Sequence, residues 1–177
     1  MNDELLLLGL LRREEMHGYQ LVEFIERNLS ACTGLKKSKA YFLLEKMASA
    51  GWVVSDERRS GKRPTRRVYR PTEQGLQVFW KMLRKQCAQF TPTYFQDDIS
   101  LLFLDELPAE EAVELLKQRR GAMEELRERM LNAPPHSGAS GWLVEHQVRY
   151  LSAELNWLDE IIQRVEEKGR VWNKSDE

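Results

Sequence analysis

The segment from residue 36 to residue 75 constrains the fold of this chain more than any other. Its first part has apolar residues at the spacing of one helix face: Ala40, Leu43, Leu44 and Met47. Gly51 then ends the helical pattern, and a hairpin follows, with Trp52-Val53-Val54 at the start of one strand, a turn at Ser60-Gly61 and a return over residues 66–70. A helix that leads directly into a basic hairpin predicts a winged helix.

The residues before this segment supply the other helices that a winged helix needs. Leu5 to Leu11 is a short apolar helix, and His17-Gly18-Tyr19 opens a second helix that Gly34 is expected to end. The third helix starts near Ser38. Three short helices within about 50 residues indicate a helix-turn-helix. Thr72 is expected to cap a fourth helix with an apolar face of Leu76, Phe79, Trp80 and Leu83.

A second domain follows a linker marked by Thr91-Pro92-Thr93. A short apolar helix is expected near residues 99–104, and Pro108 begins a longer one that ends near Asn132. After the loop at 134–138, a last helix covers about residues 140–168. We therefore predict a mostly α protein with a winged helix-turn-helix domain (1–90), a linker (91–98), a helical, coiled-coil-like dimerisation domain (99–172) and a disordered tail (173–177).

The last helix has a regular apolar pattern, with spacings that alternate between four and three residues. The members of this seam are Val144, Val148, Leu151, Leu155, Leu158, Ile162 and Val165. The seam packs either against the preceding helix of the same chain alone or also against a second subunit. Because a two-helix hairpin of this length cannot cover both of its apolar faces, we expect a homodimer with the seam at its interface.

The charge of the chain is unevenly distributed, although its net value is only −1. Residues 1–80 hold 14 basic and 10 acidic side chains, whereas residues 81–177 hold 13 and 18. From Arg58 to Arg70 there are seven basic residues and no acidic one, which is the local patch that phosphate binding requires. The hairpin residues expected to contact DNA are Arg58, Lys62, Arg63, Arg66 and Arg67.

The third helix offers a second set of candidate DNA contacts. Since successive residues turn by about 100°, Ser38, Phe42, Glu45 and Ser49 point away from the apolar stripe. Phe42 either packs on a thymine methyl group or is covered by the hairpin or by a partner chain. The helix residues expected to contact bases or phosphates are Lys37, Ser38, Lys39, Tyr41, Phe42 and Lys46.

Other classes of protein are not supported by the sequence. No apolar run approaches the roughly 20 residues that span a bilayer, and the N-terminal residues lack the pattern of a signal peptide, so we expect a cytoplasmic protein. Cys32 and Cys87 are expected to be buried. The three histidines show no ligand spacing, and no nucleophile–base pair or phosphate loop is evident. We therefore predict no metal, no cofactor and no enzymatic activity.

Several runs of residues resemble the PadR family of bacterial transcription regulators. They are LLLLGLL and MHGYQL near the start, SKAYFLLEKMASAGWV in the third helix, and RRVYRPTEQG at the end of the hairpin. The later ELPAEEAVELLKQR is similar to the longer subgroup of that family, which has a C-terminal helical dimerisation domain. Phe42 and Pro71 depart from the residues common in the family. The resemblance implies a homodimeric regulator, usually a repressor, on a pseudo-palindromic operator.

The sequence is also compatible with an effector site and with a second function. Some members of the family release DNA when they bind planar aromatic compounds, and Trp142, Tyr150 and Trp157 are the residues that could line such a site. The alternative for these three is packing in the core or at the dimer interface. The rival to a DNA-binding regulator is a protein-binding adaptor that uses its basic hairpin on an acidic partner.

Overall fold

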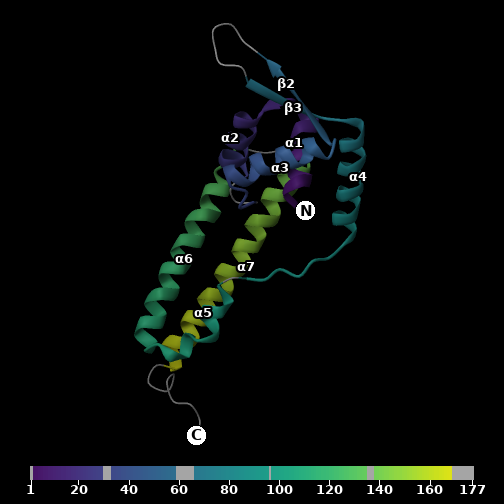
Figure 1. Cartoon of the computed structure of the whole chain (residues 1–177). Coiled ribbons are helices and arrows are strands. Elements are labelled where there is room, and N and C mark those ends of the chain that lie inside the picture. Colours follow the sequence, from purple (N-terminus) through teal and green to yellow (C-terminus); the bar gives the residue numbers. More distant parts are fainter. Residues whose placement is uncertain (1, 30–32, 59–65, 96, 135–137, 169–177) are drawn as a thin grey trace. The chain divides into compact units, whose positions relative to one another are not determined.

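The chain divides into two compact units, residues 1–92 and residues 93–177. The computed structural model describes residues 2–29, 33–58, 66–95, 97–134 and 138–168. Both units are mostly helical, and the first also carries a small antiparallel sheet (Figure 1). The predicted fold class is thereby confirmed. None of the helices in the described ranges is long and apolar enough to cross a bilayer.

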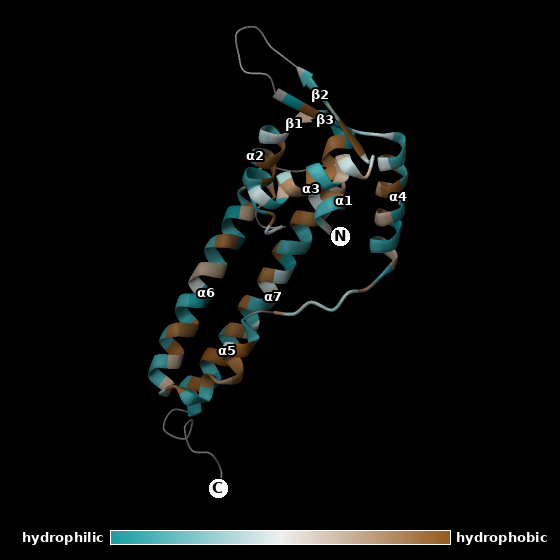
Figure 2. Cartoon of the chain, in the orientation of Figure 1, coloured by the Kyte–Doolittle hydropathy of each residue, from teal (hydrophilic) through white to brown (hydrophobic). Residues whose placement is uncertain are grey.

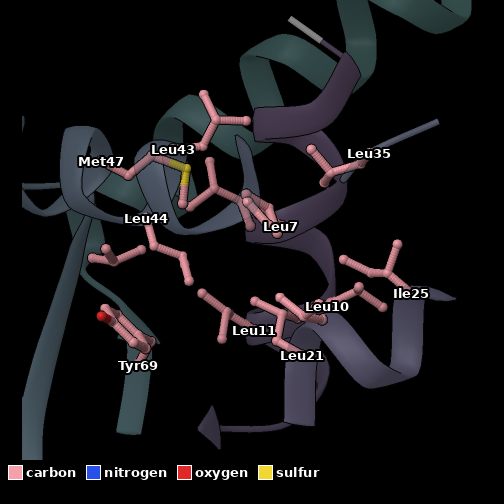
Figure 3. Packing of buried hydrophobic residues seen from close by; sticks show 14 of the residues in the cluster. Leu7, Leu10, Leu11, Leu21, Ile25, Leu35, Leu43, Leu44, Met47 and Tyr69 are labelled. Atoms are coloured by element: carbon pink, nitrogen blue, oxygen red, sulfur yellow. The ribbon is translucent and has the colours of Figure 1, made fainter. Parts of the chain in front are cut away.

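The first unit contains, in chain order, α1 (Asn2–Arg13), β1 (Met16–His17), α2 (Gly18–Asn28), α3 (Lys37–Ser49), β2 (Val53–Arg58), β3 (Arg66–Pro71) and α4 (Glu73–Ala88). Its core is formed where α1, α2 and α3 meet under the sheet. Figure 3 shows Leu7, Leu44 and Met47 pointing into the same space, together with side chains from α2 and β3. These three side chains are completely buried, so the core fixes how α3 lies against α1.

α1 is longer at both ends than the predicted Leu5–Leu11. Asp3 and Glu4 occupy its first turn, and Arg12 and Arg13 occupy its last turn. Acidic residues at the start and basic residues at the end stabilise a helix, because their charges are attracted to the partial charges at the two ends of the helix dipole. The apolar pattern alone missed both turns, since their residues are charged.

α2 is shorter than predicted, because it ends at Asn28 rather than at Gly34. Leu29 has already left the helical conformation, with φ −128° and ψ 11°. The Asn28 side-chain amide donates a hydrogen bond to the Phe24 carbonyl oxygen and so binds one of the carbonyls of the last turn. Gly34 therefore lies in the connection to α3 and does not end the helix.

α3 ends in a Schellman motif at Gly51, the residue predicted to end this helix. The Trp52 amide donates to the Met47 carbonyl oxygen and the Gly51 amide donates to that of Ala48. Gly51 has φ +74°, a left-handed conformation that glycine adopts without a steric penalty. This motif turns the chain from α3 directly into β2.

The sheet has the strand order β1-β3-β2, and both pairs are antiparallel. β1 was not predicted, because a strand of two residues leaves no alternating pattern in the sequence. The central strand β3 has both Val68 and Tyr69 buried, although the two point to opposite faces. Pro71 is the last residue of β3, a position where the missing amide hydrogen is tolerated.

α4 begins at the cap predicted from Thr72. The Thr72 hydroxyl oxygen accepts a hydrogen bond from the Gly75 amide at 3.0 Å, and the hydroxyl donates to the Gly51 carbonyl oxygen at 2.6 Å. One side chain thus connects the start of α4 to the end of α3. Gly75 lies so close to Trp52 that a Cβ atom would be 1.9 Å from the Trp52 carbonyl oxygen.

Cys87, near the end of α4, is exposed, so the prediction of a buried residue is wrong. Phe79 and Leu83 pack against the core, but the last turn of α4 extends beyond it. Cys32 lies outside the described residues.

The second unit contains α5 (Asp98–Leu102), the 3-10 helix η1 (Leu104–Glu106), α6 (Ala109–Leu131) and α7 (Ala139–Lys168). Pro108 is the N-cap of α6, and Glu110 and Glu111 lie in its first turn. Hydrophobic and hydrophilic residues alternate along both long helices (Figure 2). α6 and α7 pack together around a cluster of Ala112, Leu116, Leu158, Ile162 and Val165.

Two ion pairs also connect α6 with α7. Lys117 Nζ is 2.7 Å from Glu166 Oε1, and Arg120 makes two hydrogen bonds to the Asp159 carboxylate. The hydrogen bond from Arg120 lowers the pKa of the Asp159 carboxyl group. These pairs lie at the exposed edges of the apolar cluster and add to the contact between the two helices.

Replacing Gly75 by alanine should lower the free energy of unfolding of the first unit by about 3 kcal/mol. The added methyl group would collide with the backbone of Trp52, which cannot move without breaking the turn into β2. A urea titration followed by circular dichroism measures the change. Gly34→Ala is the control, because a Cβ atom at Gly34 meets no heavy atom of the described chain within 4 Å. Equal stability of the two variants would contradict this packing.

Candidate nucleic-acid interface

α3 presents one buried face and one exposed face. The predicted core stripe of Ala40, Leu43, Leu44 and Met47 is buried. Ser38, Phe42, Glu45 and Ser49 are exposed on the other side. Phe42 keeps 64% of its surface exposed, so strands β2 and β3 do not cover it. A large apolar side chain at the surface of a helix is available for contact with another molecule.

One flank of the exposed face lies against the start of α1. Lys39 Nζ is 2.7 Å from Asp3 Oδ2, and Lys46 Nζ is 3.0 Å from Glu4 Oε1. The hydrogen bond that the Lys39 ammonium group donates to the Asp3 carboxylate raises the pKa of Lys39. Two of the lysines predicted to contact DNA are therefore already paired with carboxylates of the same chain.

The other flank borders a cleft of about 480 Å³. The cleft is lined by residues of β1, α2, α3 and β3: His17, Gly18, Tyr19, Tyr41, Glu45, Arg67 and Tyr69. Lys37 lies nearby, with its Nζ atom 5.7 Å from the centre of the Tyr19 ring. Aromatic rings beside basic side chains can hold a phosphate or a flat group, so the cleft extends the surface of α3 toward the sheet.

Gly18 allows Tyr41 to reach this cleft. A Cβ atom at Gly18 would lie 2.8 Å from the Cε1 atom of Tyr41 and 3.4 Å from a ring atom of Tyr69. The absence of a side chain at Gly18 thus places the Tyr41 ring directly against the start of α2. Tyr41 is half-buried as a result, and it packs against the core while its edge lines the cleft.

The hairpin of β2 and β3 carries acidic as well as basic residues. Glu57 pairs with Arg67 in the ladder, and their charged atoms are 4.0 Å apart. Asp56 Oδ2 is 3.4 Å from the Nε atom of Arg70. Arg67 remains exposed, and its distance from Glu57 is at the limit for an ion pair, so its guanidinium group can contact another molecule.

The remaining hairpin residues predicted to bind DNA are described only in part. Arg58 and Arg66 form a backbone pair at the end of the ladder, and only their backbone is described by the structure. Lys62 and Arg63 lie outside the described residues. The structure therefore brings Lys37, Ser38, Tyr41, Phe42 and Arg67 to one side of the first unit.

In the second unit, most of the predicted dimerisation seam is buried within the single chain. Leu151, Leu155, Leu158, Ile162 and Val165 are buried, and the last three pack on α6. Packing of these three on α6 is expected under both alternatives, with or without a second subunit. Val144 and Val148, nearer the start of α7, are half-buried.

The three aromatic residues suggested for an effector lie at the surface of α7. Trp142 is exposed, whereas Tyr150 and Trp157 are near the border between exposed and half-buried. Tyr150 stacks on Phe95, with ring centres 5.9 Å apart, and burial raises the pKa of its phenol. Within the described residues, no three His, Cys, Asp or Glu side chains are grouped to hold a metal ion.

The sequence did not point to four acidic residues of this surface. Asp56 and Glu57 could have been found from the hairpin register, because Glu57 lies opposite Arg67 and Asp56 lies diagonally across from Arg70. Asp3 and Glu4 could not, because only the packing of α1 on α3 brings them to Lys39 and Lys46. The local positive charge is therefore smaller than the run of basic residues suggests.

The known proteins to which this chain is similar are PadR-like transcriptional regulators. Residues 7–81 match the transcriptional regulator PadR-like family. The negative transcriptional regulator PadR of Bacillus subtilis (strain 168) is 26% identical over 178 residues, which cover 90% of this chain and 95% of that protein.

Solved structures give the same fold. The crystal structure of Bacillus subtilis PadR in complex with operator DNA has a TM-score of 0.77 at 20% identity and covers 92% of this chain and 98% of that one. The structure of Bacillus subtilis PadR in complex with p-coumaric acid has a TM-score of 0.74 at 22% identity, with the same coverage of 92% and 98%.

Gly18→Ala should lower the free energy of unfolding by about 1–3 kcal/mol, because the new methyl group displaces the Tyr41 ring. In a Tyr41→Leu background, which removes the ring atom at 2.8 Å, the same change should cost less than half as much. Urea titrations of the four proteins of this cycle give the coupling. Additive effects would show that Gly18 does not position Tyr41.

Proposed function

Because this chain is a transcriptional regulator of the PadR-like family, we propose that it acts as a homodimeric repressor on a pseudo-palindromic DNA operator in the cytoplasm. α3 enters the major groove, and the hairpin of β2 and β3 contacts the phosphates beside it. The family consists of regulators rather than enzymes, in agreement with the sequence prediction.

The observation that carries this proposal is the exposed face of α3, which has basic side chains on the flank that borders the cleft. Phe42 and Ser38 lie at the centre of the face, and Lys37 and Arg67 lie on the side of the cleft. In a helix-turn-helix, residues near the start of the second helix of the motif contact base edges. Phe42 would pack on a thymine methyl group, and the Ser38 hydroxyl would bond to a base or a phosphate.

The hairpin supplies the contacts that do not depend on base sequence. Arg67 is exposed one ladder pair from the Arg58–Arg66 pair, with which the described sheet ends, and Lys62 and Arg63 lie between β2 and β3 in the sequence. Phosphate contacts of this kind fix the position of the protein on the duplex and make the affinity depend on salt.

The homodimer is supported by apolar residues that remain at the surface of the second unit. Leu143, Tyr150 and Trp157 repeat every seven residues along α7, and each keeps 37–38% of its surface exposed. Ile99, Leu102 and Phe103, in and just after α5, are exposed to a greater extent. Since the seam at Leu158, Ile162 and Val165 is covered by α6, we assign the contact with a second subunit to these exposed residues.

A two-fold dimer sets the geometry of the operator. Two copies of α3 that occupy successive major grooves on one face of the duplex lie about 34 Å apart, one helical turn of DNA. The half-sites are then inverted repeats, because the symmetry of the protein is reproduced in the DNA.

A small aromatic compound is the proposed effector. The relative that was solved with p-coumaric acid supports this class of ligand. Trp142, Tyr150 and Trp157 are the candidate contacts in this chain, with Phe95 beside Tyr150. Since Tyr150 and Trp157 are also assigned to the subunit contact, the effector would bind at the edge of that contact. Addition of p-coumaric acid, as the first compound of a panel of phenolic acids, should release the protein from its operator.

Selection of genomic fragments by the purified protein, followed by sequencing, tests the whole proposal. Recovered fragments should share an inverted repeat near a promoter. Fragments without a shared motif would favour the alternative, an adaptor whose basic hairpin binds an acidic partner, because such an adaptor does not discriminate between duplexes.

Arg67→Ala should weaken binding to every duplex by about tenfold at 100 mM salt and reduce the salt slope by about 2 per dimer, one phosphate contact for each subunit. Fluorescence anisotropy at several salt concentrations measures both quantities. Arg27→Ala is the control, since Arg27 is also an exposed cation and pairs with Glu23 on α2. An unchanged slope for Arg67→Ala would remove Arg67 from the interface.

Trp157→Glu should give a folded monomer, because the charge has no partner in an apolar contact between subunits. Leu158→Asp, one residue further, should instead reduce helicity, because Leu158 is completely buried against α6. Sedimentation and circular dichroism distinguish the two effects, and Asn156→Glu is the control at an exposed position of the same helix. A stable dimer of Trp157→Glu would place the subunit contact elsewhere.

A further inference from the structure

The start of α1 carries two carboxylates that hold the two lysines on one flank of α3. Asp3 and Glu4 are adjacent in sequence, and Lys39 and Lys46 are separated by two helical turns. The contacts are 2.7 Å for Asp3 with Lys39 and 3.0 Å for Glu4 with Lys46. The pairing thus covers the same flank of α3 over most of its length.

The two sides of each pair differ in exposure. The Asp3 and Glu4 side chains are 20% and 11% exposed, whereas those of Lys39 and Lys46 are 60% and 55% exposed. The carboxylates are therefore fixed by the fold, and the ammonium groups lie at the surface where a DNA phosphate would approach. Each phosphate has to compete with a carboxylate that is already in place.

Stability alone does not account for these pairs. α1 is held in the core by Leu7, Leu8 and Leu11, which are almost completely buried. An ion pair at the surface contributes only about 0–1 kcal/mol to stability. The carboxylates do change the charge of the α3 surface, because they neutralise two of its exposed lysines.

We propose that Asp3 and Glu4 restrain Lys39 and Lys46 and so limit the sequence-independent attraction of this protein to DNA. The inference rests on the proposed function, in which α3 enters the DNA groove. Non-specific affinity comes almost entirely from cations that displace counterions from phosphates. A lysine that is already paired contributes less to it, whereas the base contacts of Ser38 and Phe42 are unaffected. Asp3 and Glu4 thus increase the preference for the operator.

The test uses the full-length protein and a random-sequence duplex of 30 base pairs. Asp3→Asn, which leaves the shape of the side chain almost unchanged, should raise affinity by about tenfold at 100 mM salt and steepen the salt slope by 1 to 2 per dimer, as about one lysine per subunit is released. Glu4→Gln should act in the same direction through Lys46. Glu23→Gln is the matched control, because it also removes one carboxylate from an ion pair, with Arg27 on α2.

A double-mutant cycle with Lys39→Met separates restraint from simple loss of a negative charge. In the Lys39→Met background, Asp3→Asn should lose most of its effect on affinity and slope. An undiminished effect there, or a control that equals Asp3→Asn, would overturn the inference while leaving DNA binding by α3 in place. Failure of the wild-type protein to bind any duplex would instead reject the proposed function and the inference with it.

A third measurement does not require the acidic variants to fold. In the wild-type background, Lys39→Met should leave the salt slope on the random duplex almost unchanged, because Asp3 already holds this lysine. A decrease of about 2 per dimer would show that Lys39 contacts phosphate freely, and it would overturn the proposed restraint.

Discussion

The packing of α3 on α1 determines the orientation of every candidate DNA contact in this protein. Leu44 and Met47 are completely buried against the leucines of α1, and a helix held on one side must present its opposite side to solvent. This contact exposes Phe42. It also brings Asp3 to Lys39, so the same packing that presents the α3 surface sets its charge.

The turn between α3 and the sheet transmits this orientation to the hairpin. Gly51 reverses the chain, and the Thr72 hydroxyl connects that reversal to the start of α4. Gly75 permits the close approach of α4 to Trp52. Because β2 leaves the turn in a fixed direction, Arg67 lies beside α3, and the cleft with Tyr41 forms between them. The described parts of the proposed groove-binding and phosphate-binding elements therefore lie on one surface of the first unit.

The second unit shows how one apolar pattern can be interpreted in two ways. The seam through Leu158 and Val165 has the spacing of a coiled coil, and the sequence cannot tell whether the opposite helix belongs to the same chain. In the structure α6 covers it. Tyr150 and Trp157, which we propose as contacts with a second subunit, are exposed and lie outside the heptad seam.

Local chemistry and periodicity determined the elements: the stripe of α3, the Gly51 reversal, the Thr72 cap and the long helix α7 all follow from spacings of a few residues. The sequence also identified Ser38 and Phe42 as exposed, because 100° per residue places them opposite the core. Only the tertiary structure decided which charges meet. The pairing of Asp3 with Lys39 joins residues 36 positions apart, and it depends on the angle at which α1 packs on α3, which no local pattern records.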